Sequence, residues 1–177
     1  IITTSRLEKK NGIDALIKAY KLLIAHCLPV TLKILGIGRM EEELKKLSKD
    51  LQIVDRIEFL GHIHPGEIYS FLQKADIFVR PSRSEGLGSS FLEAMACGLP
   101  VIGTQVGGIP DFLEDGETGL FCKVDDPKDL AEKIELLLKD EDLYKKISEN
   151  GKNLIMEKYQ WTGIVGRIKN IFNEITK

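Results

Sequence analysis

Hydrophobic positions along the chain follow two patterns that alternate with each other. Short apolar runs rich in Ile, Val and Leu predict buried strands, and longer segments with apolar residues three or four positions apart predict amphipathic helices. Strands are expected at Ile1–Ser5, Thr31–Leu35, Arg56–Leu60, Asp76–Arg80, Pro100–Gly103 and Gly119–Cys122. Helices are expected at Gly12–His26, Met40–Leu51, Glu67–Gln73, Ser89–Cys97, Pro127–Lys139, Asp142–Tyr159 and Trp161–Ile175.

Strands that alternate with helices are typical of βαβ units, which build a mostly parallel sheet with helices on both faces. No repeat or linker divides the 177 residues, so we expect one doubly wound α/β domain with C-terminal helices. In the common strand order 3-2-1-4-5-6, ligands bind beside strands 1 and 4, where the order reverses. The loops after these strands, Arg6–Gly12 and Pro81–Gly88, are therefore expected to face each other across one crevice.

Composition and charge narrow the class of function. The chain is 43% hydrophobic and 29% charged, as in globular proteins, and its net charge of −2 without a basic stripe predicts no nucleic-acid surface. It shows neither a signal peptide nor an apolar run long enough to span a membrane. Cys27, Cys97 and Cys122 have unrelated spacings and no metal-ligand pattern. They predict buried or inert thiols in a reducing, cytoplasmic compartment.

The segment SEGLGSSFLEAMACGLPVIGT (84–104) carries the most distinctive chemistry. Gly86 and Gly88 bracket Leu87 just before the helix expected to begin at Ser89. Glycines let the backbone approach a ligand closely, and a helix N-terminus offers free N–H groups and a partial positive charge suited to phosphate. The alternative is a plain strand-to-helix turn, which uses the same glycines.

Glu93 lies inside the apolar run of this helix. Residues expected to face the core are Leu92, Met95 and Ala96. Ser89, Glu93 and Cys97 share another face, and helical side chains lean toward the N-terminus, so the carboxylate should reach back over the glycine loop. There it would suit the two O–H donors of a ribose diol. The alternative is a carboxylate that caps backbone N–H groups or pairs with an arginine.

Three more charged residues flank the expected crevice. Glu85 could accept hydrogen bonds from a sugar or act as an acid or base, and its alternative is an exposed loop charge. Arg6 and Lys10, in the opposite loop, could neutralise a diphosphate, and their alternative is ordinary surface charge.

Glu85 and Glu93 form an E-x7-E pattern, and EGLGSSFLEAMACGLPVIGT resembles the GT4-type retaining glycosyltransferases (glycosyl transferases group 1) nearly residue for residue. SRLEKKNG resembles the R-L-x-x-K-x-G loop of that family, and LKILGIGRMEEELKKL resembles its strand–G-x-G–helix segment. IEFLGHI, ADIFVRPSRSEGLG and VGGIPDFLEDGETGLFCKVDDPKDLAEKI match later segments. The resemblance covers essentially the whole chain.

This resemblance implies half of a GT-B enzyme, in which two Rossmann-like domains enclose the active site. Residues 1–177 match the C-terminal, donor-binding domain, and an N-terminal acceptor domain is expected elsewhere in a longer protein. The implied reaction transfers a sugar from a nucleotide-diphosphate sugar, with retention and without a metal or other cofactor. Many relatives build surface polysaccharides or glycolipids, which implies a peripheral place at the cytoplasmic membrane face.

The resemblance also implies residue roles. Glu93 would bind the ribose, and Glu85, the implied catalytic residue, would contact the donor sugar near its reacting carbon. Backbone N–H groups of Gly86, Leu87, Gly88 and Ser89 would hold the distal phosphate and the sugar. The segment 61–63, which ends at Ile63, would lie against the base.

The chain departs from the family pattern in the first loop. Arg6 and Lys10 would hold the diphosphate, but Asn11 takes the place before the glycine where many relatives have lysine. Ile37 stands where an aspartate is common, and it is not predicted to belong to the site.

Three other functions stay open at this point. They are a nucleotide-sugar binding module without transferase activity, a GT-B-like nucleotide-sugar epimerase, and a dinucleotide-binding domain. The last is disfavoured because the first strand is followed by Arg-Leu-Glu-Lys-Lys and not by G-x-G-x-x-G.

Overall fold

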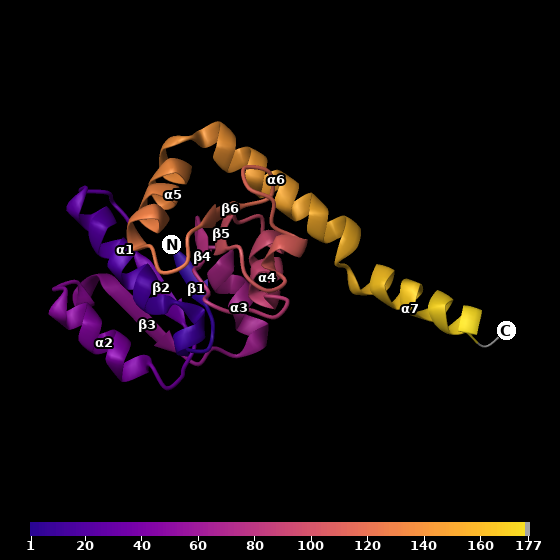
Figure 1. The fold of residues 1–177 in the computed structure, drawn as a ribbon, viewed down its shortest axis with the longest axis horizontal. Coiled ribbons are helices and arrows are strands. Elements are labelled where there is room, and N and C mark those ends of the chain that lie inside the picture. The colour runs from indigo at the N-terminus through magenta and orange to yellow at the C-terminus, as the bar shows by residue number, and fades with distance from the viewer. Residues whose placement is uncertain (176–177) are drawn as a thin grey trace.

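The computed structural model describes residues 1–175, except for the side chains of residues 161, 162, 167 and 170. Within these residues six parallel strands form one sheet in the order β3-β2-β1-β4-β5-β6, with helices on both faces (Figure 1). The strands are β1 (Ile2–Thr4), β2 (Leu32–Leu35), β3 (Ile57–Gly61), β4 (Phe78–Arg80), β5 (Val101–Thr104) and β6 (Leu120–Cys122). The helices are α1 (Ile13–Ala25), α2 (Glu41–Asp50), α3 (Pro65–Leu72), α4 (Ser89–Ala96), α5 (Pro127–Lys139), α6 (Glu141–Lys158) and α7 (Trp161–Ile175). The predicted doubly wound fold is confirmed, including the reversal of strand order at β1 and β4.

Two hydrophobic clusters lie on opposite faces of the sheet, because successive strand side chains point to opposite sides. Val79 belongs to the cluster with α1 and α5, whereas its neighbour Phe78 packs with residues of α3 and α4. The long helix α6 reaches both clusters, through Ile147 and Ile155 respectively. The sheet is thus covered on both faces, and its strand ends are left to form a site.

The predicted element boundaries agree with the structure to within about two residues. The clearest difference is α3, which begins at Pro65 and not at Glu67. Proline is suited to the first helical turn, and the side chain of His64 accepts a hydrogen bond from the N–H of Gly66 at 3.2 Å. Helix α3 therefore starts at Pro65, after a connection of only three residues from β3.

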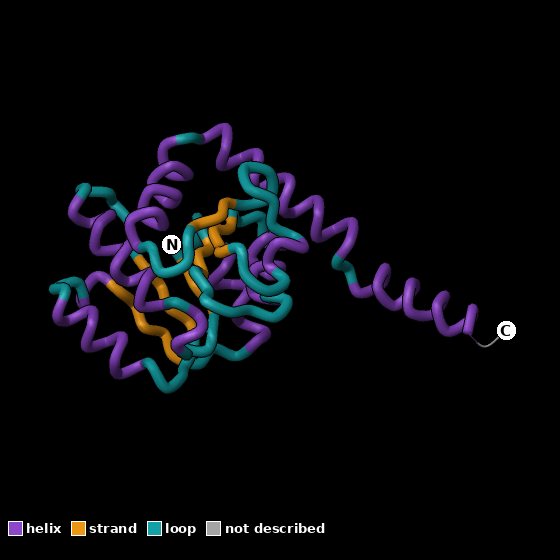
Figure 2. The backbone as a smooth tube through the Cα atoms, viewed as in Figure 1, coloured by secondary structure: helices purple, strands orange, loops and turns teal. Residues whose placement is uncertain are grey.

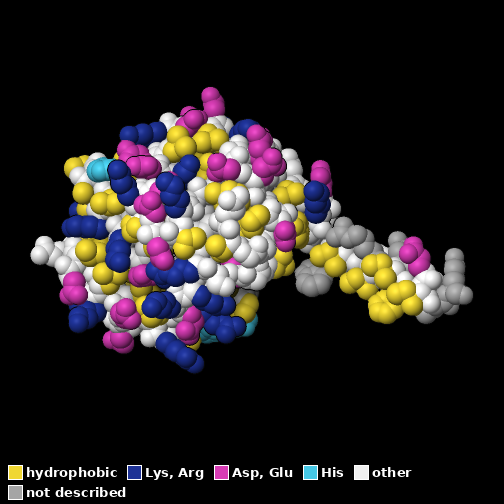
Figure 3. Space-filling model, in the orientation of Figure 1, with side chains coloured by type: hydrophobic (Ala, Val, Ile, Leu, Met, Phe, Trp, Pro, Cys, Tyr) yellow, Lys and Arg dark blue, Asp and Glu magenta, His cyan; other side chains and the backbone are white. Residues whose placement is uncertain are grey.

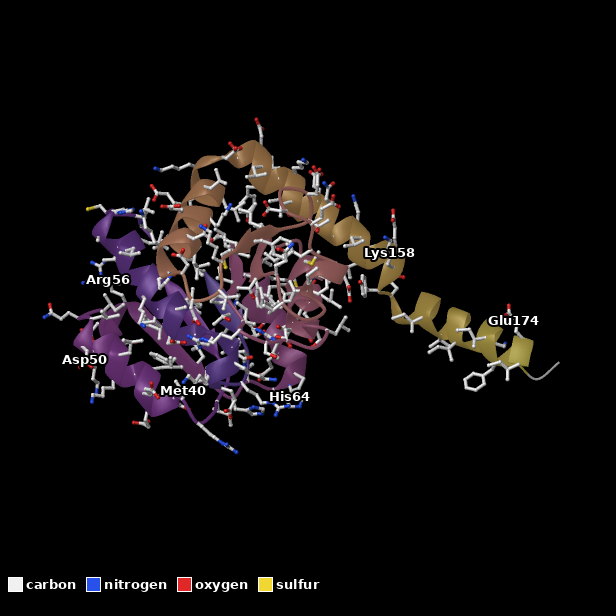
Figure 4. All side chains as sticks on the ribbon, viewed as in Figure 1. Met40, Asp50, Arg56, His64, Lys158 and Glu174 are labelled. Carbon is white, nitrogen blue, oxygen red and sulfur yellow. The ribbon has the colours of Figure 1, made fainter. Side chains whose placement is uncertain are left out.

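The carboxyl ends of the strands define one edge of the molecule. Figure 2 shows the strands as central orange segments joined to the surrounding helices by teal loops. In Figure 4, Met40 and His64, which follow β2 and β3, lie at the same edge, and Arg56, which precedes β3, lies away from it.

The last helix, α7, extends from the body of the domain (Figure 1). Apolar side chains are exposed along it, as the yellow side chains in Figure 3 show. The exposed apolar residues are Val165, Ile168, Ile171, Phe172 and Ile175. On the rest of the face shown, acidic and basic side chains are interspersed, in keeping with a net charge of −2. No helix in the described part of the chain is both long and apolar enough to cross a membrane.

The three cysteines differ in exposure, so the prediction of buried or inert thiols is met by burial at Cys122 but not at Cys27. All three thiols are free, and Cys122 is buried, but Cys27 is exposed. Cys27 follows α1 in a left-handed conformation, with φ of 59°, so it belongs to the turn that leaves the helix and not to its buried face.

Candidate functional site

A cavity of about 470 Å³ opens at the carboxyl ends of β1 to β4. Residues 4–6, 35–37 and 62–63 contribute the ends of β1, β2 and β3 and the loops after them. Arg80 comes from the end of β4, and Ser89, Ser90 and Glu93 come from α4. The cavity thus lies where the strand order reverses, as predicted. The two loops expected to face each other across it do not do so: only Arg6 of residues 6–12 and 81–88 lines the cavity, because the loops are hydrogen-bonded to each other through the N–H of Arg83 and the carbonyl oxygen of Lys10.

The first two turns of α4 form one wall of this cavity. Ser89 and Glu93 both line it, as their helical spacing predicts. Residues of α4 that face the core are Phe91, Ala94 and Met95. Ala96 is exposed, so its predicted place in the core is wrong: the buried face is centred on Phe91 and Ala94.

The Glu93 carboxylate is free to receive a ligand. No hydrogen bond to it is found among the described residues, and it lies between the α4 wall and the strand ends. Desolvation raises the pKa of the Glu93 carboxyl, and the positive charge of Arg80 opposes this shift. A group with two acceptor oxygens and no protein donor is suited to a diol.

The start of α4 offers donors for an anion. Gly88 has φ of 76° and begins the helix, and within the described residues the backbone N–H groups of Leu87, Gly88 and Ser89 have no acceptor. The N–H of Gly86 is different, because it donates to Glu85 Oε1 at 3.0 Å. Of these four predicted site residues, only Ser89 lines the cavity.

Arg6 and Lys10 are placed differently. Arg6 is exposed, lines the cavity and has no side-chain partner among the described residues. Lys10 is exposed outside the cavity, and its carbonyl oxygen accepts a hydrogen bond from the backbone N–H of Arg83 at 2.6 Å. Asn11 is buried, and its side-chain amide donates to the carbonyl oxygen of Arg6. Asn11, which takes the place of the lysine found in many relatives, thus stabilises the loop that carries Arg6.

Glu85 does not line the cavity. Its side chain is only 11% exposed and forms an ion pair with the Nη2 of Arg80. The backbone of Gly107 packs directly against the Glu85 carbonyl, and the N–H of Gly108 donates to the carbonyl oxygen of Gly86 at 2.8 Å. These contacts hold the loop that carries Glu85 in place. The two glutamates of the E-x7-E pattern therefore have different surroundings.

Sequence reasoning missed Arg80, which is ion-paired with Glu85 and interacts electrostatically with Glu93. It is 8% exposed at the end of β4. Burial lowers the pKa of its guanidinium to about 10, and the negative charge of Glu93 opposes this shift, so Arg80 is charged at neutral pH. The available signal was an arginine at the end of a predicted strand, directly after the apolar run of residues 77–79.

Part of the cavity lining is apolar, and the predicted site residue Ile63 belongs to it together with Pro65 and Ile68. His62 also lines the cavity. Ile37, which is not predicted to belong to the site, also lines the cavity. Apolar walls beside one free carboxylate are suited to a flat heterocycle attached to a ribose.

The comparison with known families decides what this cavity belongs to. The family model for glycosyl transferases group 1 matches residues 1–154. The chain belongs to this family. The resemblance inferred from the E-x7-E segment and its neighbours is thereby confirmed.

Three similar proteins show the extent of the match. An uncharacterized glycosyltransferase of Methanocaldococcus jannaschii is 35% identical over 167 residues, which are 94% of this chain and 46% of the relative. The crystal structure of the C-terminal domain of the group 1 protein LpcC from Francisella tularensis is 30% identical, with a TM-score of 0.82, and the match covers 90% of this chain and 86% of that one. Anabaena HepE in complex with UDP and glucose is 25% identical, with a TM-score of 0.88 over 98% of this chain and 48% of that one.

These coverages also place the domain. The chain spans about half the length of the curated relatives that it matches, and it fits the C-terminal domain of LpcC nearly end to end. The fold is the Rossmann-like C-terminal half of a GT-B glycosyltransferase, as the sequence predicts.

Proposed function

We propose that this chain is the donor-binding domain of a retaining glycosyltransferase and that the cavity holds a nucleotide-diphosphate sugar. The observation that carries the proposal is the joint placement of Glu93, Arg6 and Ser89 around one cavity at the β1/β4 reversal. A diol acceptor, a free cation and the N-terminus of a helix are there within reach of one ligand. UDP and UDP-glucose complexes of Anabaena HepE support the choice of ligand.

The residues would divide the donor among them. Glu93 would accept hydrogen bonds from the ribose hydroxyls, and the base would lie against His62 and Ile63. The diphosphate would lie between Arg6 and the free N–H groups at the start of α4. Lys10 stays a second candidate for binding the diphosphate. Its side chain lies outside the cavity, but it is exposed on the loop that carries Arg6.

The reaction would transfer the sugar from the diphosphate to an acceptor hydroxyl. The bond between the anomeric carbon and the phosphate oxygen breaks, and the acceptor oxygen forms the new bond on the same face. The proton of that hydroxyl passes to the departing phosphate. Arg6 and the helix N-terminus would stabilise the charge on this leaving group without a metal ion or other cofactor.

The surroundings of Glu85 favour this same-face route over double displacement. A nucleophilic carboxylate needs a free oxygen, but Glu85 is paired with Arg80 and accepts the N–H of Gly86. Hydrogen bonds and an ion pair lower the nucleophilicity of a carboxylate. We therefore assign Glu85 the catalytic role of contacting the donor sugar near its reacting carbon.

The other half of the protein completes the proposal. An N-terminal GT-B domain would hold the acceptor, and the full protein would act in the cytoplasm, peripherally at the inner membrane face, in polysaccharide or glycolipid synthesis. This chain would bind the donor but transfer no sugar by itself.

Calorimetric titration of this chain with UDP, GDP and ADP tests donor binding. We expect one of the three nucleotides to bind at a single site. A full-length protein that binds the nucleotide but releases no transferred sugar would instead be a binding module, and one that converts the donor into its epimer would be an epimerase. The anomeric configuration of the product, read by NMR, tests retention.

A further inference from the structure

We propose that Arg80 is a positioning residue that holds the Glu85 carboxylate in place for the donor sugar and does not itself bind the diphosphate. The inference rests on the proposed function, because it takes the role of Glu85 from there. It adds to the site a residue that the E-x7-E pattern does not contain.

The N–H groups of Arg80 are almost all used within the protein. Nε–H donates to Ser82 Oγ at 3.2 Å, and Nη1 donates to Ser90 Oγ at 2.5 Å and to the carbonyl oxygen of Thr4 at 3.4 Å. Nη2 faces Glu85 Oε2. A guanidinium has five N–H groups, so these contacts leave no pair of free donors for a phosphate. Arg6, which lines the cavity and is exposed and unpaired within the described residues, is available to a diphosphate instead.

The Glu85 carboxylate is held at both oxygens. Oε1 accepts the N–H of Gly86 at 3.0 Å, and Oε2 meets Arg80 Nη2 and the hydroxyl of Ser82 at 3.5 Å. Only Arg80 brings a full charge to this set. A buried carboxylate with a charged partner keeps one orientation far better than one held by neutral donors.

The Arg80 guanidinium packs against an aromatic ring that is itself buried in the core. Its Cζ lies 5.5 Å from the centre of the Phe91 ring, which packs edge-on against Phe78 at 5.1 Å. Gly103 lies under the same ring, and a Cβ there would come within 2.9 Å of Phe91. Because Phe91 belongs to α4 and Phe78 to β4, Arg80 fixes Glu85 relative to both elements that build the cavity.

Arg80 acts on Glu93 only through space. No hydrogen bond joins the two side chains among the described residues, although their charges influence each other. Arg80→Lys keeps this charge but cannot reproduce the contacts of the guanidinium with Ser82, Ser90 and Glu85. This variant therefore tests the positioning of Glu85 while it leaves the surroundings of Glu93 nearly unchanged.

The experiment uses the full-length protein that contains this chain, with UDP and UDP-glucose as probes. Calorimetry gives the Kd for UDP, and release of UDP from UDP-glucose gives kcat and KM. We expect Arg80→Lys and Glu85→Gln each to lower kcat by about tenfold or more and to leave the Kd for UDP within about twofold. The double variant should be no slower than the slower single variant, because both changes remove one interaction.

A matched arginine serves as the control. Arg83 lies in the loop that carries Glu85 and is ion-paired with Asp14 at 2.8 Å, but it makes no contact with Glu85 among the described residues. Arg83→Lys should therefore combine additively with Glu85→Gln. If Arg80→Lys does not fold, Ser82→Ala removes a neutral contact of both Arg80 and Glu85 and should lower kcat in the same way.

The outcomes separate the two proposals. If Arg80→Lys weakens UDP binding as strongly as Arg6→Lys does, Arg80 is a phosphate ligand and the inference is wrong. Additive losses in the Arg80→Lys, Glu85→Gln pair, or an unchanged kcat in Arg80→Lys, would also overturn it. If the wild-type protein binds none of UDP, GDP and ADP, the proposed function has failed, and the role of Arg80 fails with it.

Discussion

The replacement of Glu93 by glutamine probes the free carboxylate of the cavity. Glu93→Gln keeps the length of the side chain and one acceptor oxygen, but it removes the negative charge and replaces the second acceptor by a donor. Glu93 makes no hydrogen bond within the described residues, so the change breaks no protein contact of its own. Its main effect should therefore appear in ligand binding.

The size of the effect follows from the bonds to the ribose diol. Two hydroxyls would donate to two carboxylate oxygens, and the amide leaves one of these bonds unmade. A hydrogen bond to a charged group contributes about 1.5–3 kcal/mol. At about 1.4 kcal/mol per factor of ten, UDP affinity should fall by between about tenfold and about a hundredfold.

Calorimetric titration of UDP into the 177-residue chain measures this change. Glu149→Gln is the matched control, because Glu149 is exposed on α6, away from the cavity. It should bind UDP as the wild type does. The reasoning is refuted if Glu93→Gln binds UDP within about twofold of the wild type while its thermal unfolding shows an intact fold, because Glu93 then does not receive the ribose.

Three more predictions concern metal, backbone and pH. UDP binding should survive EDTA, and a loss on chelation that Mn²⁺ restores would contradict a cradle made of Arg6 and the α4 N-terminus. Gly107→Ala should lower the free energy of unfolding in urea by more than about 2 kcal/mol, because Gly107 has a φ of 56° and the new Cβ would lie 1.9 Å from the Glu85 carbonyl oxygen. Gly86→Ala is the control: open space surrounds Gly86, so its free energy of unfolding should change little. Desolvation raises the pKa of Glu93 in the folded protein, so UDP affinity should be full above that pKa and fall as pH drops through it. The small stabilisation of the fold by protonated Glu93 should be present at low pH and lost as pH rises. Glu93→Gln should show neither pH dependence.

The fold and the place of the cavity could be predicted because both follow from local patterns. Alternating strands and helices with right-handed crossovers permit few sheet orders, and the common one brings the ends of β1 and β4 together. Helical spacing then put Ser89 and Glu93 on one face, and both line the cavity. These predictions needed no knowledge of contacts between distant segments.

The surroundings of α4 were predicted less well, because its apolar residues are consecutive. Phe91 and Leu92 are both apolar, so periodicity alone cannot decide which of them marks the centre of the buried face. Packing decides it: Phe91 lies between Phe78 and Phe112, at 5.1 and 5.8 Å between ring centres. Ala96 is exposed as a result.

Arg80 could not be found from the sequence for a different reason. A lone arginine at the end of a strand has no pattern of its own, and its partners come from three places: Thr4 from β1, Ser82 and Glu85 from the loop after β4, and Ser90 from α4. Only the pairing of β1 with β4 and the turn into α4 bring these groups together. The fold therefore creates this contact set, and no segment of the sequence contains it.

The seven residues between Glu85 and Glu93 now have a structural meaning. They take the chain from the loop after β4 through the first turn of α4, so that Arg80 is ion-paired with Glu85 and also interacts electrostatically with Glu93. Glu85 is already held by Arg80, Ser82 and the N–H of Gly86, whereas Glu93 has both oxygens free within the described residues. In the proposed function, a nucleotide would be bound at Glu93 without breaking any protein contact, and the attached sugar would then meet a carboxylate whose orientation is fixed in advance. Fixing it beforehand means that the donor sugar need not supply binding energy to order Glu85.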